Sequence, residues 1–411
     1  MPKRNYKNWL RAYADFTKYS ESPALFHFWV GVSTIAGALR RQVWIDERYF
    51  QWTPNFYIIL VGPPGVAAKS TSVRIGMHLL SQVDGVKFGP QSMTWQALTQ
   101  ALADAFVEVP FGDAISGSYL PMSCITCAIS ELGTFLKPDD GALIDTMVSL
   151  WDGQLEVWGH HTKTQGKTDI VNPWINIIGC TTPNWLQSNF PESLVGGGLT
   201  SRIVFVYGDK KRHLVPYPSQ LIADEYYDEE GKKLVEDLQT IGMIKGEYSL
   251  TKDARAWGAV WYEKLWGPRP LHLASDRFSG YIARKQTHLH KVAMILAASQ
   301  RDELIIEEQD LISANDFVTA LEDDMQKVFQ SMGGHTHAGY ASEVLSYIKA
   351  FQRITYRELY VKCFNTMSER EFMDATTALV TAGYVHCSGK GIDSIFTTLT
   401  SVINKTEKPS E

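Results

Sequence analysis

Cysteine is scarce in this chain, with five residues in 411. They are Cys124, Cys127, Cys180, Cys363 and Cys387, and thiols so few and scattered predict a reducing compartment rather than a disulfide-stapled fold. Cys124 and Cys127 form a C-x-x-C pattern inside an apolar run. No second cysteine or histidine pair lies near that pattern, so we interpret both thiols as core residues rather than as a metal or redox site.

Long apolar runs and a large excess of either charge are also lacking. No run has the length of a membrane span, and the first residues, MPKRNYKNWLRAYADF, are amphipathic and aromatic rather than a secretory signal. We therefore expect a cytoplasmic protein without a membrane partner. The formal net charge of −6 provides no general attraction to nucleic acid, so any nucleic-acid surface must be a local basic patch.

The sequence does contain an alternation of buried strands and helices. Continuous apolar runs at residues 55–61, 124–130, 175–182 and 202–208 are typical of strands covered on both faces, and residues 85–89 are a shorter candidate. Helical patterns separate these runs, and residues 94–109 have the pattern of one helix. This order predicts the α/β class, with a five-stranded parallel sheet and right-handed crossovers.

The same patterns divide the chain into five parts. Residues 1–50 are predicted to be a helical lead-in, and residues 51–213 the α/β core. Helical patterns then dominate residues 214–333. Residues 338–402 contain three helices followed by a hairpin, which is the pattern of a winged helix. Residues 403–411 are a polar tail that we expect to be flexible.

The stretch LVGPPGVAAKSTS, residues 60–72, resembles a phosphate-binding loop with one residue too many. The usual signature is G-x-x-x-x-G-K-[ST], but here the lysine comes one position late and alanines precede it. A strand, a Gly-rich turn and a helix that begins with Lys-Ser would still direct backbone N–H groups and a helix dipole at an anion. An ordinary turn into a helix is the alternative. The predicted nucleotide-binding residues are Gly62, Pro63, Pro64, Gly65, Val66, Ala67, Ala68, Lys69, Ser70 and Thr71.

Polar residues end two further strands. The strand of residues 124–130 ends in Ser130-Glu131, where Glu131 is a candidate base for an attacking water. Ser70 and Ser130 are candidate ligands of Mg²⁺, although Ser130 stands where an acid is usual. We expect the strand of residues 175–182 to lie between the two phosphate-site strands, so that Thr182 or Asn184 at its tip orients the water. Helix-start and turn roles are the alternatives for these residues.

Arg202 follows a Gly-rich loop, at the start of the last predicted strand. Its guanidinium fork matches phosphate oxygens, so Arg202 is a candidate arginine finger that reaches the nucleotide of a neighbouring subunit. The alternative is an ordinary surface arginine.

The order of these motifs resembles the AAA+ ATPases of the ASCE division of P-loop NTPases. The chain is most similar to the minichromosome-maintenance (MCM) branch and to phage and mobile-element ATPases regarded as replicative helicases. The likeness lies in residues 22–65, in GLTSRIVFVYGD at residues 198–209, and in YIARKQTHLHKVAMILAAS at residues 281–299. It implies a helical lid in which Lys291 takes the place of a sensor arginine. Arg284 lies two turns upstream on the same face, and which of the two contacts nucleotide stays open.

The resemblance also implies a DNA-binding hairpin before the sensor strand, directed into a central pore. Residues 155–174 contain two extended runs around the turn HHTKTQGKT, in which His160, His161, Lys163 and Lys167 would contact DNA phosphates. A solvated surface hairpin is the alternative. Metal binding by His160 and His161 is disfavoured because adjacent strand residues face opposite ways. Lys390 at the wing tip is a further DNA candidate, but the third winged-helix helix has few cations, which favours a packing or protein-contact role.

These features together predict an ATP- and Mg²⁺-dependent helicase or translocase. By resemblance it would act as a homo-oligomeric ring, a hexamer, on single-stranded DNA in phage or mobile-element replication, with other replication proteins as partners. A rival function is an ATP-gated DNA-binding loader or adaptor that does not unwind, since Ser130 and the unusual loop would slow turnover. A monomeric P-loop kinase is a third alternative, and it predicts no role for Arg202.

Overall fold

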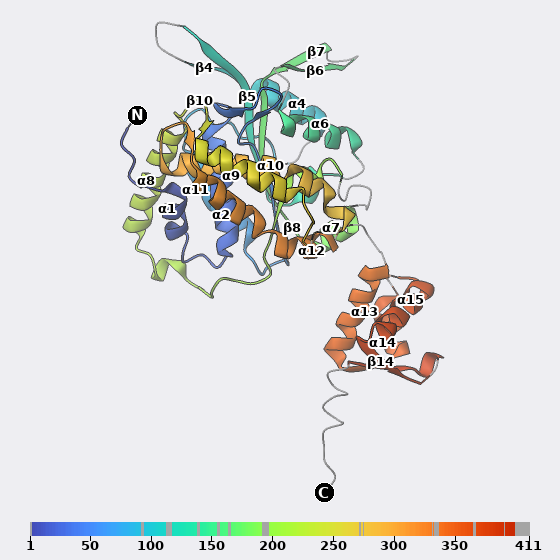
Figure 1. Cartoon of the computed structure of the whole chain (residues 1–411). Helices are drawn as coiled ribbons and strands as arrows, with labels where there is room; N and C mark the ends of the chain where they lie inside the picture. Colours follow the sequence, from blue (N-terminus) through green and yellow to red (C-terminus); the bar gives the residue numbers. More distant parts are fainter. Residues whose placement is uncertain are drawn as a thin grey trace.

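The computed structural model describes most of the chain (Figure 1). The described residues are 2–91, 94–111, 117–137, 140–153, 157–162, 166–190, 197–270, 273, 275–330, 332, 337–364, 367–389 and 391–398. Among them, only the backbone is described at residues 160–162, 166–168, 276, 326, 330, 337–339 and 342. These residues form two hydrophobic cores, one within residues 9–332 and one within residues 340–396.

The larger core surrounds a five-stranded sheet with the order β4-β5-β8-β3-β9. Its strands are β3 (Tyr57–Val61), β4 (Phe106–Pro110), β5 (Tyr119–Ile129), β8 (Pro173–Thr181) and β9 (Ile203–Tyr207). β5, β8, β3 and β9 run parallel to one another, so the four long apolar runs are confirmed as parallel strands. β8 lies between β3 and β5, as predicted for the strand of residues 175–182.

The prediction of five parallel strands is wrong at one edge of the sheet. Residues 85–89 provide only an isolated bridge, between Phe88 and Thr126, and the fifth strand is β4, which pairs antiparallel with β5. We predicted one helix over residues 94–109, but helix α4 (Trp95–Asp104) ends at Asp104. The side chains that follow alternate between exposed and half-buried, and this two-residue period suits an edge strand better than a helix turn.

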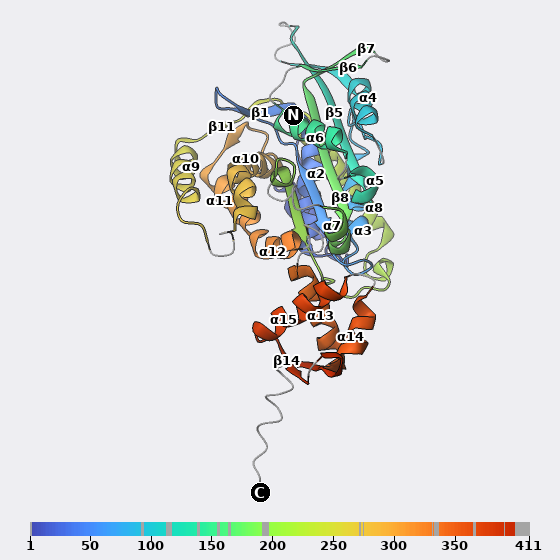
Figure 2. The same ribbon diagram turned by 90° about the vertical axis from the view of Figure 1, so that its right-hand side faces the viewer.

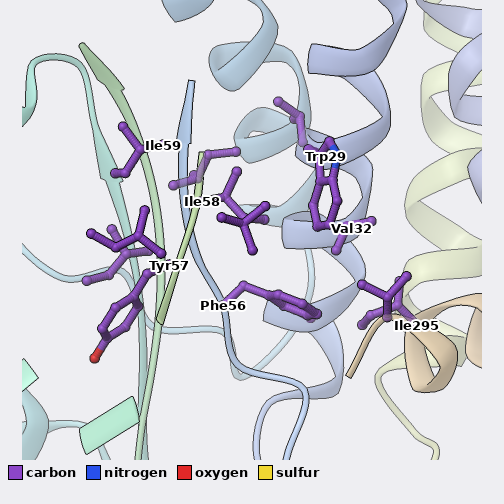
Figure 3. Packing of buried hydrophobic residues seen from close by; sticks show 14 of the residues in the cluster. Trp29, Val32, Phe56, Tyr57, Ile58, Ile59 and Ile295 are labelled. Carbon is purple, nitrogen blue, oxygen red and sulfur yellow. The ribbon is translucent and has the colours of Figure 1, made fainter. Parts of the chain in front are cut away.

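Helices cover both faces of the sheet. Figure 3 shows Phe56 and Ile58 directed toward Trp29 of helix α2 (Ala24–Leu39), whereas Tyr57 points to the other face. There the Tyr57 hydroxyl donates a hydrogen bond to the carbonyl oxygen of Met147, 2.8 Å away, in helix α6 (Gly141–Asp152). Successive residues of β3 therefore pack against different helices, as expected for a strand buried on both sides.

The predicted lead-in, residues 1–50, is part of the larger core. Helix α1 (Trp9–Phe16) packs against α2, and helix α8 (Asp224–Ile241) packs against both. The indole N–H of the buried Trp9 donates to the carbonyl oxygen of Leu234 at 2.9 Å. The boundary at residue 50 falls inside a hairpin of β1 (Val43–Asp46) and β2 (Gln51–Trp52), and β1 also pairs with β10 (Gly246–Glu247). Residues 1–50 and 214–333 therefore interleave with the α/β core.

The remaining elements of the larger core complete this arrangement. Helix α10 packs against both α2 and α11, and α9 packs against α11. The helices are α3 (Lys69–Leu80), α5 (Leu132–Phe135), α7 (Pro183–Asn189), α9 (Lys252–Leu265), α10 (Ser279–Gln300), α11 (Glu308–Thr319) and α12 (Glu322–Gln330), and the short strands are β6 (Val157–Thr162), β7 (Gly166–Val171), β11 (Ser249–Leu250) and β12 (Ile305–Ile306). None of the described helices is both long and apolar enough to cross a bilayer.

The smaller core contains three helices and a three-stranded antiparallel sheet with the order β13-β15-β14. The three helices and the hairpin predicted for residues 338–402 are present, and β13 is an additional strand. Capping boxes at Thr355 and Ser368 begin the second and third helices. The elements are α13 (His337–Phe351), β13 (Arg353–Thr355), α14 (Tyr356–Cys363), α15 (Glu369–Thr381), β14 (Val385–Ser388) and β15 (Ile395–Thr398).

Three histidines buried in the larger core predict a loss of stability in acid. Burial lowers the pKa of His27, His288 and His290 to about 4 in each case. The unfolded state keeps values near 6.5 and so binds protons more readily than the folded state, which loses stability as pH falls from about 6.5 to about 4. We expect a loss of about 1–3 kcal/mol per histidine, measured by urea denaturation across this range. His290→Gln should reduce the pH dependence, and the same change at the exposed His78 should not; equal profiles for both variants would contradict this assignment.

Candidate nucleotide-binding site

The loop between β3 and α3 is anchored at both ends. Helix α3 begins at Lys69, as predicted. At the strand end, a Cβ added to Gly62 would lie 2.2 Å from the carbonyl oxygen of Gly208, so only glycine fits between β3 and the end of β9. Farther along, the Ser22 hydroxyl donates to the carbonyl oxygen of Ala68 at 3.0 Å. The extra residue is therefore accommodated in a loop that is fixed to its surroundings.

Ala68 has the left-handed backbone conformation that usually requires glycine, with φ 45° and ψ 39°. A left-handed alanine costs roughly 1 kcal/mol, part of which a glycine loses again in the entropy of the unfolded chain. We expect Ala68→Gly to raise the free energy of unfolding by up to about 1 kcal/mol. Ala67→Gly is the matched control, because Ala67 is buried and has no positive φ, and this change should lower that free energy. Chemical denaturation measures both, and destabilisation by Ala68→Gly would contradict the argument.

The Lys69 amine lies within the loop. Its Nζ donates to the carbonyl oxygens of Gly62, at 2.6 Å, and Pro63, at 3.1 Å. Burial lowers the pKa of this amine, and the neighbouring Cys180 is a smaller opposing influence. An incoming phosphate would therefore replace these two backbone carbonyl oxygens as the hydrogen-bond partner of the ammonium group.

The ends of three parallel strands meet at one cavity of about 640 Å³. It is lined by Lys69 and Ser70 at the start of α3, by Ser130 and Glu131 at the end of β5, and by Thr182 after β8. The carboxyl ends of parallel strands share one edge of a sheet, which explains why residues so distant in sequence converge. The cavity can therefore offer a cation, a carboxylate, hydroxyl groups and a helix N-terminus to one anionic ligand.

Other predicted residues have different places. Pro64, Gly65 and Ala68 line the cavity, whereas Val66, Ala67 and Asn184 are not among the lining residues. Thr182 caps helix α7, since its side chain accepts a hydrogen bond from the N–H of Trp185 at 3.2 Å. Of the two predicted water-orienting residues, Thr182 is therefore the one at the cavity.

A second cavity, which the sequence analysis missed, adjoins the first. Its volume is about 450 Å³, and Ala68 lines both cavities. The second is lined by α1 and the residues after it, by Thr71 and Arg74 of α3, and by residues 215–227. Tyr19 and Tyr227 contribute aromatic rings, and Glu21 a carboxylate. These segments come from three separate regions of the chain, so no local pattern in the sequence indicates the cavity.

Arg202 lies at the opposite end of the sheet from the 640 Å³ cavity, since it directly precedes β9. Its Nε and Nη2 donate to the two carboxylate oxygens of Asp152 at 3.2 and 2.5 Å, and its Nη1 donates to the carbonyl oxygen of Gly198 at 2.6 Å. Its side chain is only 6% exposed. Arg202 therefore cannot act on the cavity of its own chain, and its reaching the cavity of another copy requires exchange of the Asp152 contacts.

Arg284 and Lys291 lie near Arg202 rather than at the phosphate cavity of their own chain. Lys291 is buried, donates to the Asn55 side-chain oxygen at 2.7 Å, and has its Nζ 3.7 Å from the centre of the Trp151 ring. Burial lowers its pKa well below the usual value. Arg284 is 35% exposed and lies 3.5 Å from Asp152. Lys291 thus has a structural environment, and Arg284 is the member of the predicted sensor pair that solvent can reach.

The hairpin predicted within residues 155–174 is present. Strands β6 and β7 pair antiparallel, with His161 opposite Lys167, and Figures 1 and 2 both show the hairpin projecting from one end of the molecule. Since β8 begins just after β7, this is the end of the sheet at which Arg202 lies. Lys163 and Lys390 lie outside the described residues, as do the side chains of His160, His161 and Lys167.

A metal ion in the 640 Å³ cavity would have few protein ligands. The described residues contain no group of three or more His, Cys, Asp or Glu side chains that could hold a metal by themselves. Mg²⁺ commonly keeps several waters and binds substrate phosphates together with one or two protein ligands. The two predicted ligands, Ser70 and Ser130, both line the cavity, and their hydroxyl groups fit that kind of site. Burial raises the pKa of the nearby Cys180 to about 12, and Mg²⁺ takes oxygen ligands rather than thiols.

Comparison of the sequence with protein-family models finds no match, and comparison with curated proteins finds none either.

Proposed function

We propose that the chain binds ATP with Mg²⁺ in the 640 Å³ cavity and hydrolyses it. The observation that carries this proposal is the convergence of Lys69, Ser70, Glu131 and Thr182 around one cavity at the ends of β3, β5 and β8. The order of those strands, with β8 in the middle, supports a place among the AAA+ ATPases. The antiparallel β4 and the seven-residue spacing from Gly62 to Lys69 are the particular features of this chain.

In this proposal each of the four converging residues has one role in ATP binding or hydrolysis. Lys69 leaves the carbonyl oxygens of Gly62 and Pro63 for the terminal phosphates, while the N–H groups at the start of α3 face the same anion. The Ser70 hydroxyl helps to hold Mg²⁺, which supplies positive charge to the phosphates when bound. Glu131 accepts a proton from the attacking water, and Thr182 orients that water.

The second cavity extends the proposed site toward the nucleoside. It begins at Ala68, where the first cavity ends, and its aromatic and polar lining suits a planar base with hydrogen-bonding edges. The base and ribose would therefore lie between the first helices and residues 215–227, with the phosphates on the other side of Ala68.

We further propose that the active form is a homo-oligomeric ring in which Arg202 faces the nucleotide of a second copy. Arg202 lies at the wrong end of its own sheet to act within the chain, which favours action between chains. The β6–β7 hairpin lies at the same end, and its cationic turn would follow single-stranded DNA in the ring. Hydrolysis would then drive translocation in DNA replication, in the host cytoplasm if the chain is phage-encoded.

An ATP-gated loader or adaptor is the second candidate, and one observation favours it. Glu131 is the carboxylate among the described lining residues, while Ser130 takes the place of the usual second acid. A site with one carboxylate would bind nucleotide well and turn it over slowly. Tight binding with negligible hydrolysis would therefore support the switch, and hydrolysis stimulated by single-stranded DNA would support the motor.

Two measurements test the proposal. The first is binding of a fluorescent ATP analogue to the full chain, followed by anisotropy. Lys69→Ala should weaken binding at least tenfold, the loss of roughly 1.4 kcal/mol or more that a charge-assisted phosphate contact predicts. Lys137→Ala is the control, because this exposed lysine lies outside the cavity lining. No binding by the wild type would overturn the nucleotide site.

The second measurement tests sharing of sites between chains. Wild type is mixed with increasing fractions of Arg202→Ala, and steady-state ATP hydrolysis is followed with single-stranded DNA present. Activity should fall more steeply than the fraction of wild type, because each variant chain disables the nucleotide of its neighbour. A strictly proportional fall would contradict the shared site, as would full activity of Arg202→Ala alone.

A further inference from the structure

A second cluster of charged residues surrounds the C-terminal end of helix α6. Asp152 is the last residue of that helix, and its carboxylate is shared by Arg202 and Arg284. The next residue, Gly153, accepts a hydrogen bond from Nη2 of Arg41 at 2.9 Å. The C-terminal end of a helix carries partial negative charge, which favours such a gathering of cations. One carboxylate shared by two guanidinium groups compensates each of them less fully than a one-to-one pair would.

Arg202 and Arg284 contact the same two side chains, Trp151 and Asp152. The guanidinium carbons of Arg202 and Arg284 lie 5.6 and 5.9 Å from the centre of the Trp151 ring, and both groups contact Asp152. A cavity of about 290 Å³ opens here and is lined by Trp151, Asp152, Arg284 and Lys291. Arg284 is 35% exposed and Arg202 only 6%. An anion that enters from solvent would therefore meet Arg284 first and would then compete with Asp152 for Arg202.

The Asp152 carboxylate and a phosphate would bind the Arg202 guanidinium with similar strength. A guanidinium fork binds a carboxylate and a phosphate with the same two parallel hydrogen bonds, and a phosphate of higher charge binds at least as strongly. Exchange of Asp152 for a phosphate would therefore need little net free energy. Because the two partners are similar in strength, the Arg202 side chain can have two states, one bound to Asp152 and one bound to a phosphate.

Asp152 is also connected to the hairpin. Helix α4 packs both against α6, whose last residue is Asp152, and against β7 of the hairpin. On the near side, the Asn55 side-chain amide donates to the carbonyl oxygen of Trp151 at 3.0 Å, which ties the end of α6 to the start of β3. A shift of α6 at Asp152 would thus be passed to β7 through α4.

We propose that Asp152 is a positioning residue that holds Arg202 and Arg284 as a pair until a phosphate of a nucleotide on a second copy displaces it, and that this release shifts the β6–β7 hairpin. The inference rests on the proposed function, because it requires a nucleotide on a neighbouring copy. It assigns to one carboxylate the coupling between nucleotide binding and DNA binding.

The test compares two affinities of the full-length chain. Anisotropy of a labelled single-stranded oligonucleotide gives the DNA affinity with and without a nonhydrolysable ATP analogue, and the analogue is titrated separately. In the wild type, the analogue should change DNA affinity by a factor of about 5–150. Asp152→Asn keeps the shape and removes the charge. Without the analogue, this variant should already bind DNA with the affinity that the wild type has when the analogue is bound. It should also bind the analogue several-fold more tightly than the wild type does. Asp145→Asn, at an exposed position on the same helix, should match the wild type.

A second background shows whether Asp152 acts through the arginines. In the double variant Arg202→Ala, Arg284→Gln, the further change Asp152→Asn should alter the analogue affinity less than twofold, because the carboxylate no longer competes for either arginine. Asp152→Asn with wild-type coupling would overturn the inference. An equal effect of this change with and without the two arginines would also overturn it, since Asp152 would then act by another route.

Asp152→Asn leaves the nearly buried Arg202 without its charge partner, so its folding must be checked by thermal denaturation. If it does not fold, Arg284→Gln replaces it, because that side chain is partly exposed and its loss leaves the Arg202–Asp152 pair intact. Arg284→Gln should reduce the effect of the analogue on DNA affinity at least threefold, and an unchanged effect would overturn the inference. Absence of analogue binding to the wild type would instead contradict the proposed function, so the two failures are distinguishable.

Discussion

Glu131→Gln is expected to reduce the rate of ATP hydrolysis by a factor of about 10²–10⁴ while ATP affinity changes less than threefold. Glu131 is the second residue after β5 and lines the cavity together with Lys69 and Ser70. Glutamine keeps the length and the hydrogen-bonding oxygen of the side chain but cannot take a proton from water. Loss of turnover with retained binding is therefore the result that separates a base from a residue that merely shapes the pocket.

The measurement is steady-state hydrolysis alongside anisotropy of a fluorescent ATP analogue, with and without single-stranded DNA. Glu108→Gln is the control, because Glu108 is exposed on the edge strand β4 and should leave both quantities unchanged. If Glu131→Gln keeps more than about a tenth of the wild-type rate, Glu131 is not the base. A loss of binding together with turnover would indicate a structural role for this carboxylate.

Lys285→Met is expected to lower the free energy of unfolding by about 3–5 kcal/mol. The Lys285 amine donates to the Glu322 carboxylate at 2.5 Å and to the Thr319 hydroxyl at 3.1 Å. The Tyr281 hydroxyl donates to the same carboxylate at 2.9 Å. The side chains of Lys285 and Glu322 are 9% and 4% exposed, so removal of the lysine takes a positive charge away from a carboxylate in the interior.

The double variant Lys285→Met, Glu322→Leu should recover most of that loss, because an apolar pair of similar volume has no charge to compensate. Urea denaturation followed by tryptophan fluorescence is the appropriate measurement. All 12 tryptophans precede residue 267, so the signal reports the larger core and not the smaller one. Lys252→Met, at an exposed position in α9, should cost less than about 0.5 kcal/mol. A double variant no more stable than Lys285→Met would show that the charge pair is not the reason for the loss.

The sequence predicts the elements whose signals are local. Continuous apolar runs indicate β3, β5, β8 and β9, because a strand covered on both faces needs apolar side chains on both. The helix start at Lys69 follows from the change from a Gly-Pro turn to helix-forming residues. β4 was missed because its few residues continue the apolar spacing of α4, and only pairing with β5 decides between a helix turn and a strand.

Pairings between distant segments could not be predicted. Nothing near Asp152 indicates that Arg202 and Arg284 share its carboxylate, since these contacts require β9 and α10 to be in place. Lys291 was assigned to nucleotide by its position in a resembling helix, whereas its burial against Asn55 and Trp151 depends on packing across the whole core. From the sequence, Thr182 and Asn184 were equally good candidates for the water-orienting residue, and only the direction of α7 places Thr182 at the cavity.

The interleaving of α1, α2, α8 and α10 affects how the protein is made. Helix α2 is almost wholly apolar, and its partners α8 and α10 are synthesised long after it leaves the ribosome. Nascent chains add roughly 5–20 residues per second, so this helix remains uncovered for many seconds. We expect chaperones that bind apolar nascent segments to engage α2, and we expect recombinant yield to rise with their supply and at lower growth temperature.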